Sequence, residues 1–175
     1  MKNVNSLTTR PTYMTARPRL AIYVDGANID RASDELGIKI KYSRFKTFLT
    51  GTRTLAFANY YNSHSSDLGD RAFYHRLETL GYNVILGPAI IVGRSQKEVD
   101  VQIAVDATSN AYDNLFDIAL IASGDGDLAP VIRKLRAMIK PVEIASFRKQ
   151  LSMSLLTSAT RIIDLTANID RIRWV

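Results

Sequence analysis

The sequence contains no cysteine and only two histidines among its 175 residues. This scarcity excludes disulfides, zinc–thiolate sites and cysteine nucleophiles, and it leaves a histidine-based metal site with too few ligands. No stretch approaches the roughly 18 apolar residues that span a bilayer. The N-terminal segment also lacks the apolar core of a signal peptide, because Asn, Thr, Pro and Arg interrupt it. We therefore expect a cytoplasmic protein that makes no membrane contact.

Several nucleotide and hydrolase motifs are also missing. No GxGxxG follows a predicted strand and no GxxxxGK[ST] occurs, so neither a dinucleotide site nor a P-loop is supported. No GxSxG elbow is present, which removes the signature of the α/β-hydrolases. The chemistry of this chain must come from other residue types.

The composition is that of a globular domain with a basic surface. The formal net charge is +6 and the pI about 9.6, which favours a polyanionic partner. Basic residues concentrate in residues 31–53 and 133–149. For the charge alone, solvated helix faces are an equally good explanation, because many basic proteins bind no nucleic acid.

Apolar runs alternate with helical periods along most of the chain. Residues 1–18 have no such pattern and are predicted to be a flexible tail, and residues 19–175 to be one domain. We expect strands at residues 20–24, 54–61, 82–86, 116–122, 142–146 and 161–165. We expect helices at residues 27–36, 67–80, 99–112, 128–138 and 151–159. This order predicts an α/β fold with a doubly wound, mainly parallel five- or six-stranded sheet and helices on both faces.

Acidic residues follow two of the predicted strands. If the first strand is central and the fourth lies beside it, ligands bind in the crevice beyond the ends of these two strands. Asp25 follows the first strand, and Asp125 and Asp127 follow the fourth. Three clustered carboxylates repel one another unless a hard cation such as Mg²⁺ or Mn²⁺ joins them. Each acid singly could instead be a helix or turn cap. The adjacent glycines are expected to permit unusual backbone angles and close approach of a substrate: Gly26, Gly124 and Gly126.

Four further polar residues are candidates for the same site. Asp100 begins a predicted helix, where it could bind the metal or simply complement the helix dipole. Asp106 lies six residues further on, about 120° around that helix, so we expect it to support the ligands or to hold an Asn or Arg partner. Asn28 could orient a water or the scissile phosphate, or cap a helix. Ser123 precedes the acidic loop and could bond a carboxylate or a water.

Three segments together resemble a known family. Residues 22–28 (IYVDGAN), 97–106 (KEVDVQIAVD) and 123–128 (SGDGDL) are similar to the NYN domain of the PIN-like nuclease superfamily, and most similar to its LabA-like branch. Residues 146–156 resemble the C-terminal segment of that branch, and the resemblance spans roughly residues 20–165. Thr160 departs from the pattern, because an acid is expected there.

The resemblance implies a PIN-like fold and cleavage of RNA that depends on Mg²⁺ or Mn²⁺. The positions of its acidic site are occupied by Asp25, Asp100, Asp125 and Asp127. On this hypothesis the protein is an endoribonuclease in which these carboxylates hold a metal-activated water, with Asp25 and Asp125 as direct ligands. Basic side chains would hold the RNA backbone, and the candidates are Arg31, Lys41, Arg44, Lys97 and Arg148.

Other interpretations stay open at this point. Tyr60 and Tyr61 could stack on bases or be buried strand residues. A non-catalytic module that binds RNA or a protein would keep the fold without the chemistry, and a homodimer is compatible with either reading. A phosphatase of the haloacid dehalogenase type also has a strand-end Asp, but it needs a second Asp where this chain has Ala27.

Overall fold

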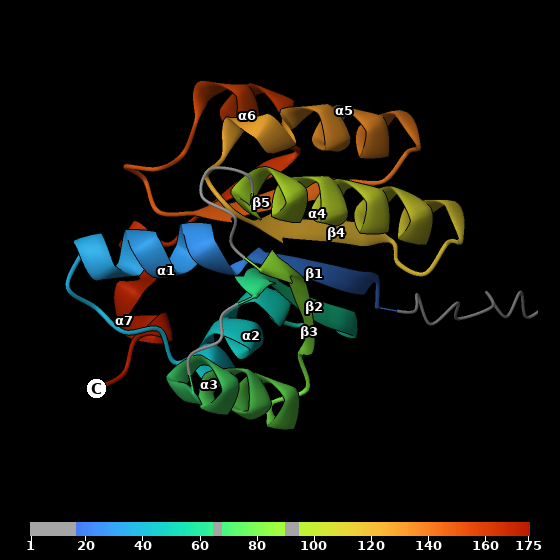
Figure 1. The fold of residues 1–175 in the computed structure, drawn as a ribbon. Coiled ribbons are helices and arrows are strands. Elements are labelled where there is room, and N and C mark those ends of the chain that lie inside the picture. Colours follow the sequence, from blue (N-terminus) through green and yellow to red (C-terminus); the bar gives the residue numbers. More distant parts are fainter. Residues whose placement is uncertain (1–16, 65–67, 90–94) are drawn as a thin grey trace, which may run out of the picture.

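The computed structural model describes residues 17–64, 68–89 and 95–175 and contains one six-stranded sheet (Figure 1). Its strand order is β3-β2-β1-β4-β5-β6, and every neighbouring pair is parallel. The strands are β1 (Arg19–Asp25), β2 (Thr54–His64), β3 (Asn83–Ala89), β4 (Ile118–Ala122), β5 (Val142–Ser146) and β6 (Arg161–Asp164). The order reverses between β1 and β4, so the predicted switch point lies at the centre of the sheet.

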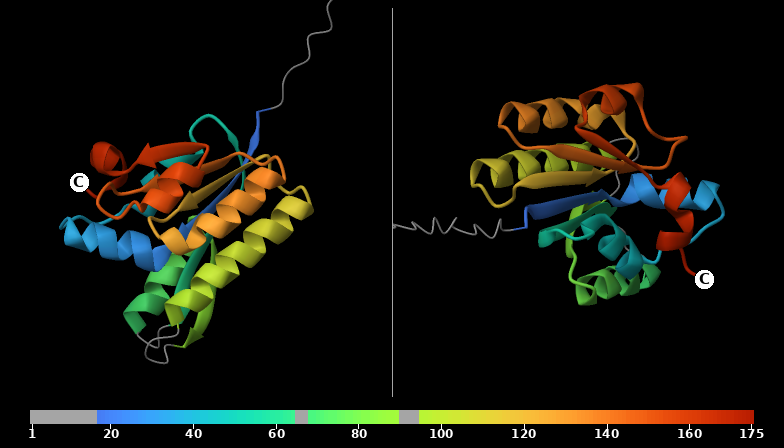
Figure 2. Two further views of the ribbon diagram at one scale, coloured as in Figure 1. Left: turned by 90° about the horizontal axis from the view of Figure 1, so that it is seen from above. Right: turned by 180° about the vertical axis from the view of Figure 1, so that it is seen from behind.

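Helices cover both faces of the sheet, as the views in Figure 2 show. One face carries α1 (Gly26–Glu35), α2 (Tyr42–Thr50), α3 (Leu68–Thr79) and α7 (Ile169–Ile172). The other carries α4 (Ser95–Tyr112), α5 (Ala129–Ala137) and α6 (Met153–Ser158). Two short 3-10 helices, η1 (Gly126–Leu128) and η2 (Thr166–Asn168), precede α5 and α7. No helix in the part of the chain that the structure describes is both long enough and apolar enough to cross a membrane.

The position of β1 inside the sheet, with helices on both faces, explains why its sequence is almost entirely apolar. Leu20 and Ile22 belong to the core beneath α1, α2 and α3, whereas Ala21 and Tyr23 belong to the core beneath α4 and α5. Because successive side chains point to opposite faces, a strand covered on both faces must be apolar at every position. The predicted α/β class, doubly wound sheet and helices on both faces are confirmed.

Several elements differ from the prediction, which did not include the short helix α7 and ended β2 at residue 61. Helix α2 was not predicted, although Tyr42, Phe45 and Leu49 have helical spacing and are buried. Strand β3 was predicted to end before Gly87, yet it continues to Ala89. This continuation is possible because β3 is an edge strand with an irregular register at its end, where a proline breaks no inner ladder. Most of the predicted N-terminal tail, residues 1–16, lies outside the described residues.

Candidate functional site

Asp25 is the last residue of β1 and also the N-cap of α1. Its side chain is buried, with 1% of its surface exposed. One carboxylate oxygen accepts a hydrogen bond from the Asn28 amide at 3.1 Å and the other from the Ser123 hydroxyl at 2.8 Å. Burial raises the pKa of Asp25 and the nearby charge of Asp125 adds to this, whereas the two hydrogen bonds and Arg31 lower it. The carboxylate therefore joins the ends of β1 and β4.

Asn28 and Ser123 make further bonds that hold these two strand ends together. The Asn28 side-chain oxygen accepts a hydrogen bond from the Gly124 amide at 2.9 Å. Ser123 is fully buried, and its hydroxyl oxygen accepts from the Asp125 amide at 3.1 Å. Both residues thus lie beside the strand-end acids, where the sequence predicted them. Their bonds position Asp25 and the loop that carries Asp125.

Asp125 and Asp127 lie in the turn that follows β4. Asp125 is the N-cap of η1, and one of its carboxylate oxygens accepts from the Asp127 amide at 2.9 Å. The capping role that was the simpler explanation of Asp125 is therefore real, and it leaves the second carboxylate oxygen for other partners. Asp127 is exposed and lines a hollow of about 310 Å³ together with Asp100, Val101 and Ala104 of α4.

Asp100 brings a fourth carboxylate to this place from α4. Only 9% of its surface is exposed, and its Oδ1 atom has no hydrogen-bond partner. Burial, followed in order of effect by the charges of Asp25, Asp125 and Asp127, raises the pKa of Asp100 to about 7. These four residues, which we call the acidic cluster, are close enough to influence one another's protonation.

The acidic cluster fits a hard divalent cation in its donor chemistry. All four residues offer carboxylate oxygens, which Mg²⁺ and Mn²⁺ prefer as ligands. The buried Asp100 oxygen has no hydrogen-bond partner and is therefore available to bind a cation. Within the ranges that the structure describes, however, no three acidic or histidine side chains already converge around one point. Each hydrogen-bonded oxygen of Asp25 and Asp125 accepts a single bond and keeps a lone pair for a cation, so binding requires the carboxylates to move closer together but not to give up these bonds.

The glycines beside the acids serve close packing. Gly26, Gly124 and Gly126 do not have positive φ; among the described glycines, only Gly37, Gly51 and Gly81 do. The expectation of unusual backbone angles at the three site glycines was therefore wrong. A Cβ atom at Gly26 would overlap the Tyr60 ring, and one at Gly124 would overlap the backbone carbonyl of Gln150.

Asp106 faces a different set of partners from the acidic cluster. Its carboxylate accepts hydrogen bonds from the Tyr61 hydroxyl at 2.9 Å and from the Gln102 amide at 2.8 Å. It thus ties α4 to β2. Tyr60 and Tyr61 have exposed fractions of 0% and 1%, so the buried-strand alternative is confirmed and base stacking on their rings is excluded.

The predicted RNA-binding residues have different environments. Arg31 is exposed on α1, and its charge lowers the pKa of Asp25. Lys41 lies 4.6 Å from the centroid of the Trp174 ring, and Arg44 is exposed on α2. The side chain of Lys97 lies outside the described residues. Among the predicted RNA-binding residues whose side chains the structure describes, Arg31 is the one whose charge acts on the acidic cluster.

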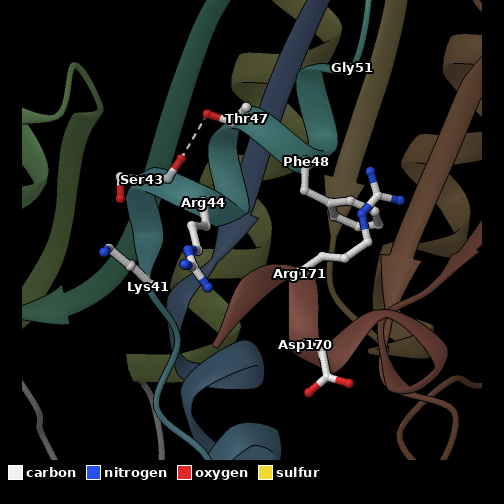
Figure 3. Close-up of a pocket in the computed structure, with 8 residues that line it drawn as sticks. All are labelled: Lys41, Ser43, Arg44, Thr47, Phe48, Gly51, Asp170 and Arg171. Atoms are coloured by element: carbon white, nitrogen blue, oxygen red, sulfur yellow. Dashed lines mark hydrogen bonds between the residues drawn. The ribbon is translucent and has the colours of Figure 1, made fainter. Parts of the chain in front are cut away.

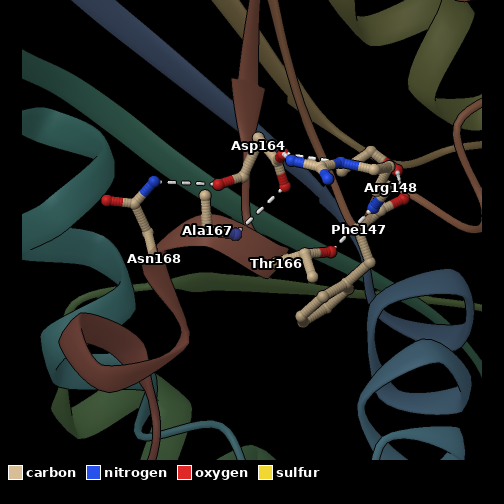
Figure 4. Close-up of polar contacts among 7 residues, drawn as sticks. Phe147, Arg148, Asp164, Thr166, Ala167 and Asn168 are labelled. Carbon is tan, nitrogen blue, oxygen red and sulfur yellow. Dashed lines mark hydrogen bonds and ion pairs between the residues drawn. The ribbon is translucent and has the colours of Figure 1, made fainter.

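Arg148 is engaged by an acid of its own (Figure 4). Its guanidinium donates to Asp164 Oδ2 from Nε at 3.0 Å and from Nη2 at 2.5 Å. The Arg148 amide donates to the Thr166 hydroxyl, and Asp164 also accepts from the Ala167 amide. Although burial opposes it, the bonds from Arg148 and Ala167 hold the pKa of Asp164 below its usual range. This arrangement gives Arg148 a structural partner at the start of η2.

The sequence did not single out Asp30, a half-buried residue in the second turn of α1. It accepts hydrogen bonds from the hydroxyls of Tyr42 and Tyr60. Burial raises the pKa of Asp30, and these two bonds lower it. The partners are 12 and 30 residues away in the chain, so no local spacing could have indicated them.

Comparisons with known proteins agree with this architecture. A family model described as the NYN domain matches residues 19–166. No curated protein matches the chain. Among solved structures, the chain is similar to the crystal structure of a protein of unknown function from Vibrio parahaemolyticus RIMD 2210633. That match has a TM-score of 0.80 and 25% sequence identity, and it covers 91% of this chain and 98% of the other.

Proposed function

The chain belongs to the NYN domain family, and from this premise we propose that it is a ribonuclease that cleaves RNA with the help of Mg²⁺ or Mn²⁺. The match to the NYN domain supports this proposal, because that domain is related to the PIN-like nuclease superfamily and suggests hydrolysis of phosphodiester bonds. Within the family, we propose the LabA-like branch on the segments at residues 22–28 and 146–156.

One observation carries this proposal. The buried Asp100 has an oxygen without a partner and a pKa raised to about 7, with Asp25, Asp125 and Asp127 contributing to the increase. A buried carboxyl group in such surroundings stays largely protonated at neutral pH unless something stabilises its ionised state. A divalent cation would do so, because it pairs with several carboxylates at once.

The residues of the acidic cluster have separable tasks in this proposal. Asp25 and Asp125 would hold the cation, and Asp100 and Asp127 would complete its surroundings from α4 and from the turn after β4. Asn28 and Ser123 would keep Asp25 in place through the bonds already described. When bound, the cation would lower the pKa of an attacking water and offset charge on the phosphate oxygens.

The first test is cleavage of a labelled pool of single-stranded and structured RNA with Mn²⁺, with Mg²⁺ and with EDTA. We expect the wild-type protein to cleave only with a metal, and Asp25→Asn to be inactive, a loss of at least about 100-fold. The Asn side chain can still accept from the Asn28 amide, so the fold should persist.

The matched control is Asp113→Asn, the same substitution at an exposed position near the end of α4. It should retain full activity. Cleavage by folded Asp25→Asn at the wild-type rate would contradict the assignment of the site.

A non-catalytic RNA-binding module is the second candidate. One observation favours it: in the described part of the chain, no three metal-ligating side chains stand ready around one point. RNA binding that is indifferent to Mg²⁺ and Mn²⁺, together with no cleavage in either metal, would support this candidate over the nuclease.

A further inference from the structure

A basic groove separates α2 from α7, on the face of the sheet opposite α4 (Figure 3). Its volume is about 570 Å³. The lining residues are Lys41, Ser43, Arg44, Thr47, Phe48, Gly51, Asp170 and Arg171. We call this the α2–α7 groove.

The positive charges of the groove are not neutralised within the protein. Among the described residues, no acidic side chain forms an ion pair with Lys41, Arg44 or Arg171. The one acid of the lining, Asp170, is already paired with Arg173 at 2.8 Å. The groove therefore presents three unpaired cations to solvent.

Aromatic rings hold two of these cations in place. The Arg171 guanidinium lies 4.4 Å from the centroid of the Phe48 ring, and Lys41 lies 4.6 Å from that of Trp174. Stacking on a ring face leaves the edge of a guanidinium, with its N–H donors, free for a phosphate. Trp174 is 57% exposed and offers a surface on which a base can stack. Cations next to an exposed aromatic ring match single-stranded nucleic acid better than an acidic peptide.

We propose that the α2–α7 groove binds backbone phosphates of a single-stranded RNA, at a place separate from the acidic cluster. The inference rests on the proposed ribonuclease function, because it assigns a holding site to the same substrate. Helix α1, whose N-cap is Asp25, leads through residues 36–41 to α2, which lines the groove (Figure 1). Its ten residues span about 15 Å. An RNA that occupies both places must follow a path on the scale of this helix.

The test is binding of labelled single-stranded RNA, in EDTA so that no cleavage occurs, measured by fluorescence anisotropy over a range of salt. The Lys41→Gln/Arg44→Gln variant should bind on the order of tenfold more weakly at 0.1 M salt. For this variant, the slope of the logarithm of the RNA association constant against the logarithm of the salt concentration should become shallower by about 1.4. Each phosphate contact to a single strand contributes about 0.7 to this slope, and two contacts are lost. Two controls accompany it: Lys41→Arg/Arg44→Lys keeps both charges, and Arg133→Gln/Lys134→Gln removes two exposed charges from α5.

Wild-type affinity and slope are expected in both controls. An equal loss in the α5 variant would overturn the proposal, because net charge alone would then explain binding. Unchanged binding in Lys41→Gln/Arg44→Gln would also overturn it. Acetylation of the wild-type protein gives an answer independent of variant folding: bound RNA should protect Lys41 and leave Lys134 reactive, and equal reactivity at both would refute the groove.

The two proposals can fail separately. RNA that binds through the groove in EDTA, with no cleavage in any metal, would leave the groove standing and remove the nuclease. Metal-dependent cleavage and RNA binding that are both unchanged in Lys41→Gln/Arg44→Gln would support the nuclease and overturn the groove.

Discussion

Asp25 and Asp100 show how one residue type takes two states in the same acidic cluster. Asp25 accepts hydrogen bonds from the Asn28 amide and the Ser123 hydroxyl, whereas Asp100 has a buried oxygen with no hydrogen-bond partner. Hydrogen bonds to an ionised carboxylate oppose the effect of burial on its pKa, so the satisfied acid stays easier to ionise. Asp100 is therefore the residue whose charge depends most on a bound cation.

Asp30 gives a prediction at the residue scale. Its pKa is raised above 3.8 in the folded protein, so the folded state binds this proton more tightly than the unfolded state does. The free energy of unfolding should therefore fall as pH rises from about 3.8 through the raised folded pKa, and then level off. In Asp30→Asn this contribution is absent. Urea unfolding of both proteins at several pH values measures the difference, in which the other acids cancel.

That difference, wild type minus Asp30→Asn, should decrease with rising pH. An increase would mean that the Tyr42 and Tyr60 hydroxyls lower the pKa of Asp30 more than burial raises it, and would contradict the prediction.

At the scale of elements, α4 matters because it carries both Asp100 and Asp106. Its position on the sheet is fixed by apolar residues such as Ile103 and Ala107, which are fully buried, and by polar bonds such as the one that the Tyr61 hydroxyl of β2 donates to Asp106. Tyr61 also accepts a hydrogen bond from the buried Asn59 at 2.9 Å. The Tyr61–Asp106 bond therefore joins a helix to the strand beneath it.

We predict that Tyr61→Phe lowers the free energy of unfolding by about 1–2 kcal/mol, because the buried Asn59 amide loses its acceptor. Asp106→Asn is the control, since its amide oxygen can still accept from Tyr61. Urea unfolding at one pH measures both. An equal decrease in the free energy of unfolding in both variants would mean that the Asp106 charge, and not the Tyr61 hydroxyl, provides the stabilisation.

At the scale of the whole molecule, a cation in the acidic cluster would connect β1, the turn after β4, and α4. Binding to the folded state alone stabilises it by about 2.7 kcal/mol when the metal is a hundredfold above its Kd. For a protein of this size, that corresponds to a rise in Tm of about 5–10 °C.

We therefore expect Mn²⁺ or Mg²⁺ to raise the Tm of the wild-type protein, and EDTA to reverse the rise. Differential scanning calorimetry at about pH 8, where Asp100 with its pKa of about 7 is ionised, is the measurement. Asp100→Asn should lose the rise and Asp113→Asn should keep it. The same rise in Asp100→Asn would indicate binding elsewhere on the protein.

Much of the fold was predictable because its signals are local. Six apolar runs, each with a turn or helix after it, sufficed for the parallel sheet, and two of the predicted helices, α1 and α3, are followed by glycines with positive φ, Gly37 and Gly81. Helix α2 was missed because its tyrosine, phenylalanine and threonine residues favour strands by propensity. The spacing of Tyr42, Phe45 and Leu49 was the better guide.

The sequence by itself determined that Asp25 lies at the end of the first strand and that Asp125 and Asp127 follow the fourth, because apolar runs and turn residues are local signals. That these two strands are neighbours was an assumption about strand order, which the structure confirms. Only the tertiary structure decided which polar groups touch. The Asp25–Ser123 hydrogen bond joins residues 98 apart in sequence, and the Arg148 guanidinium, a predicted RNA contact, donates a hydrogen bond to Asp164. Burial and hydrogen bonding are set by packing across the whole chain, and they alone decide that Asp100 is left without a partner.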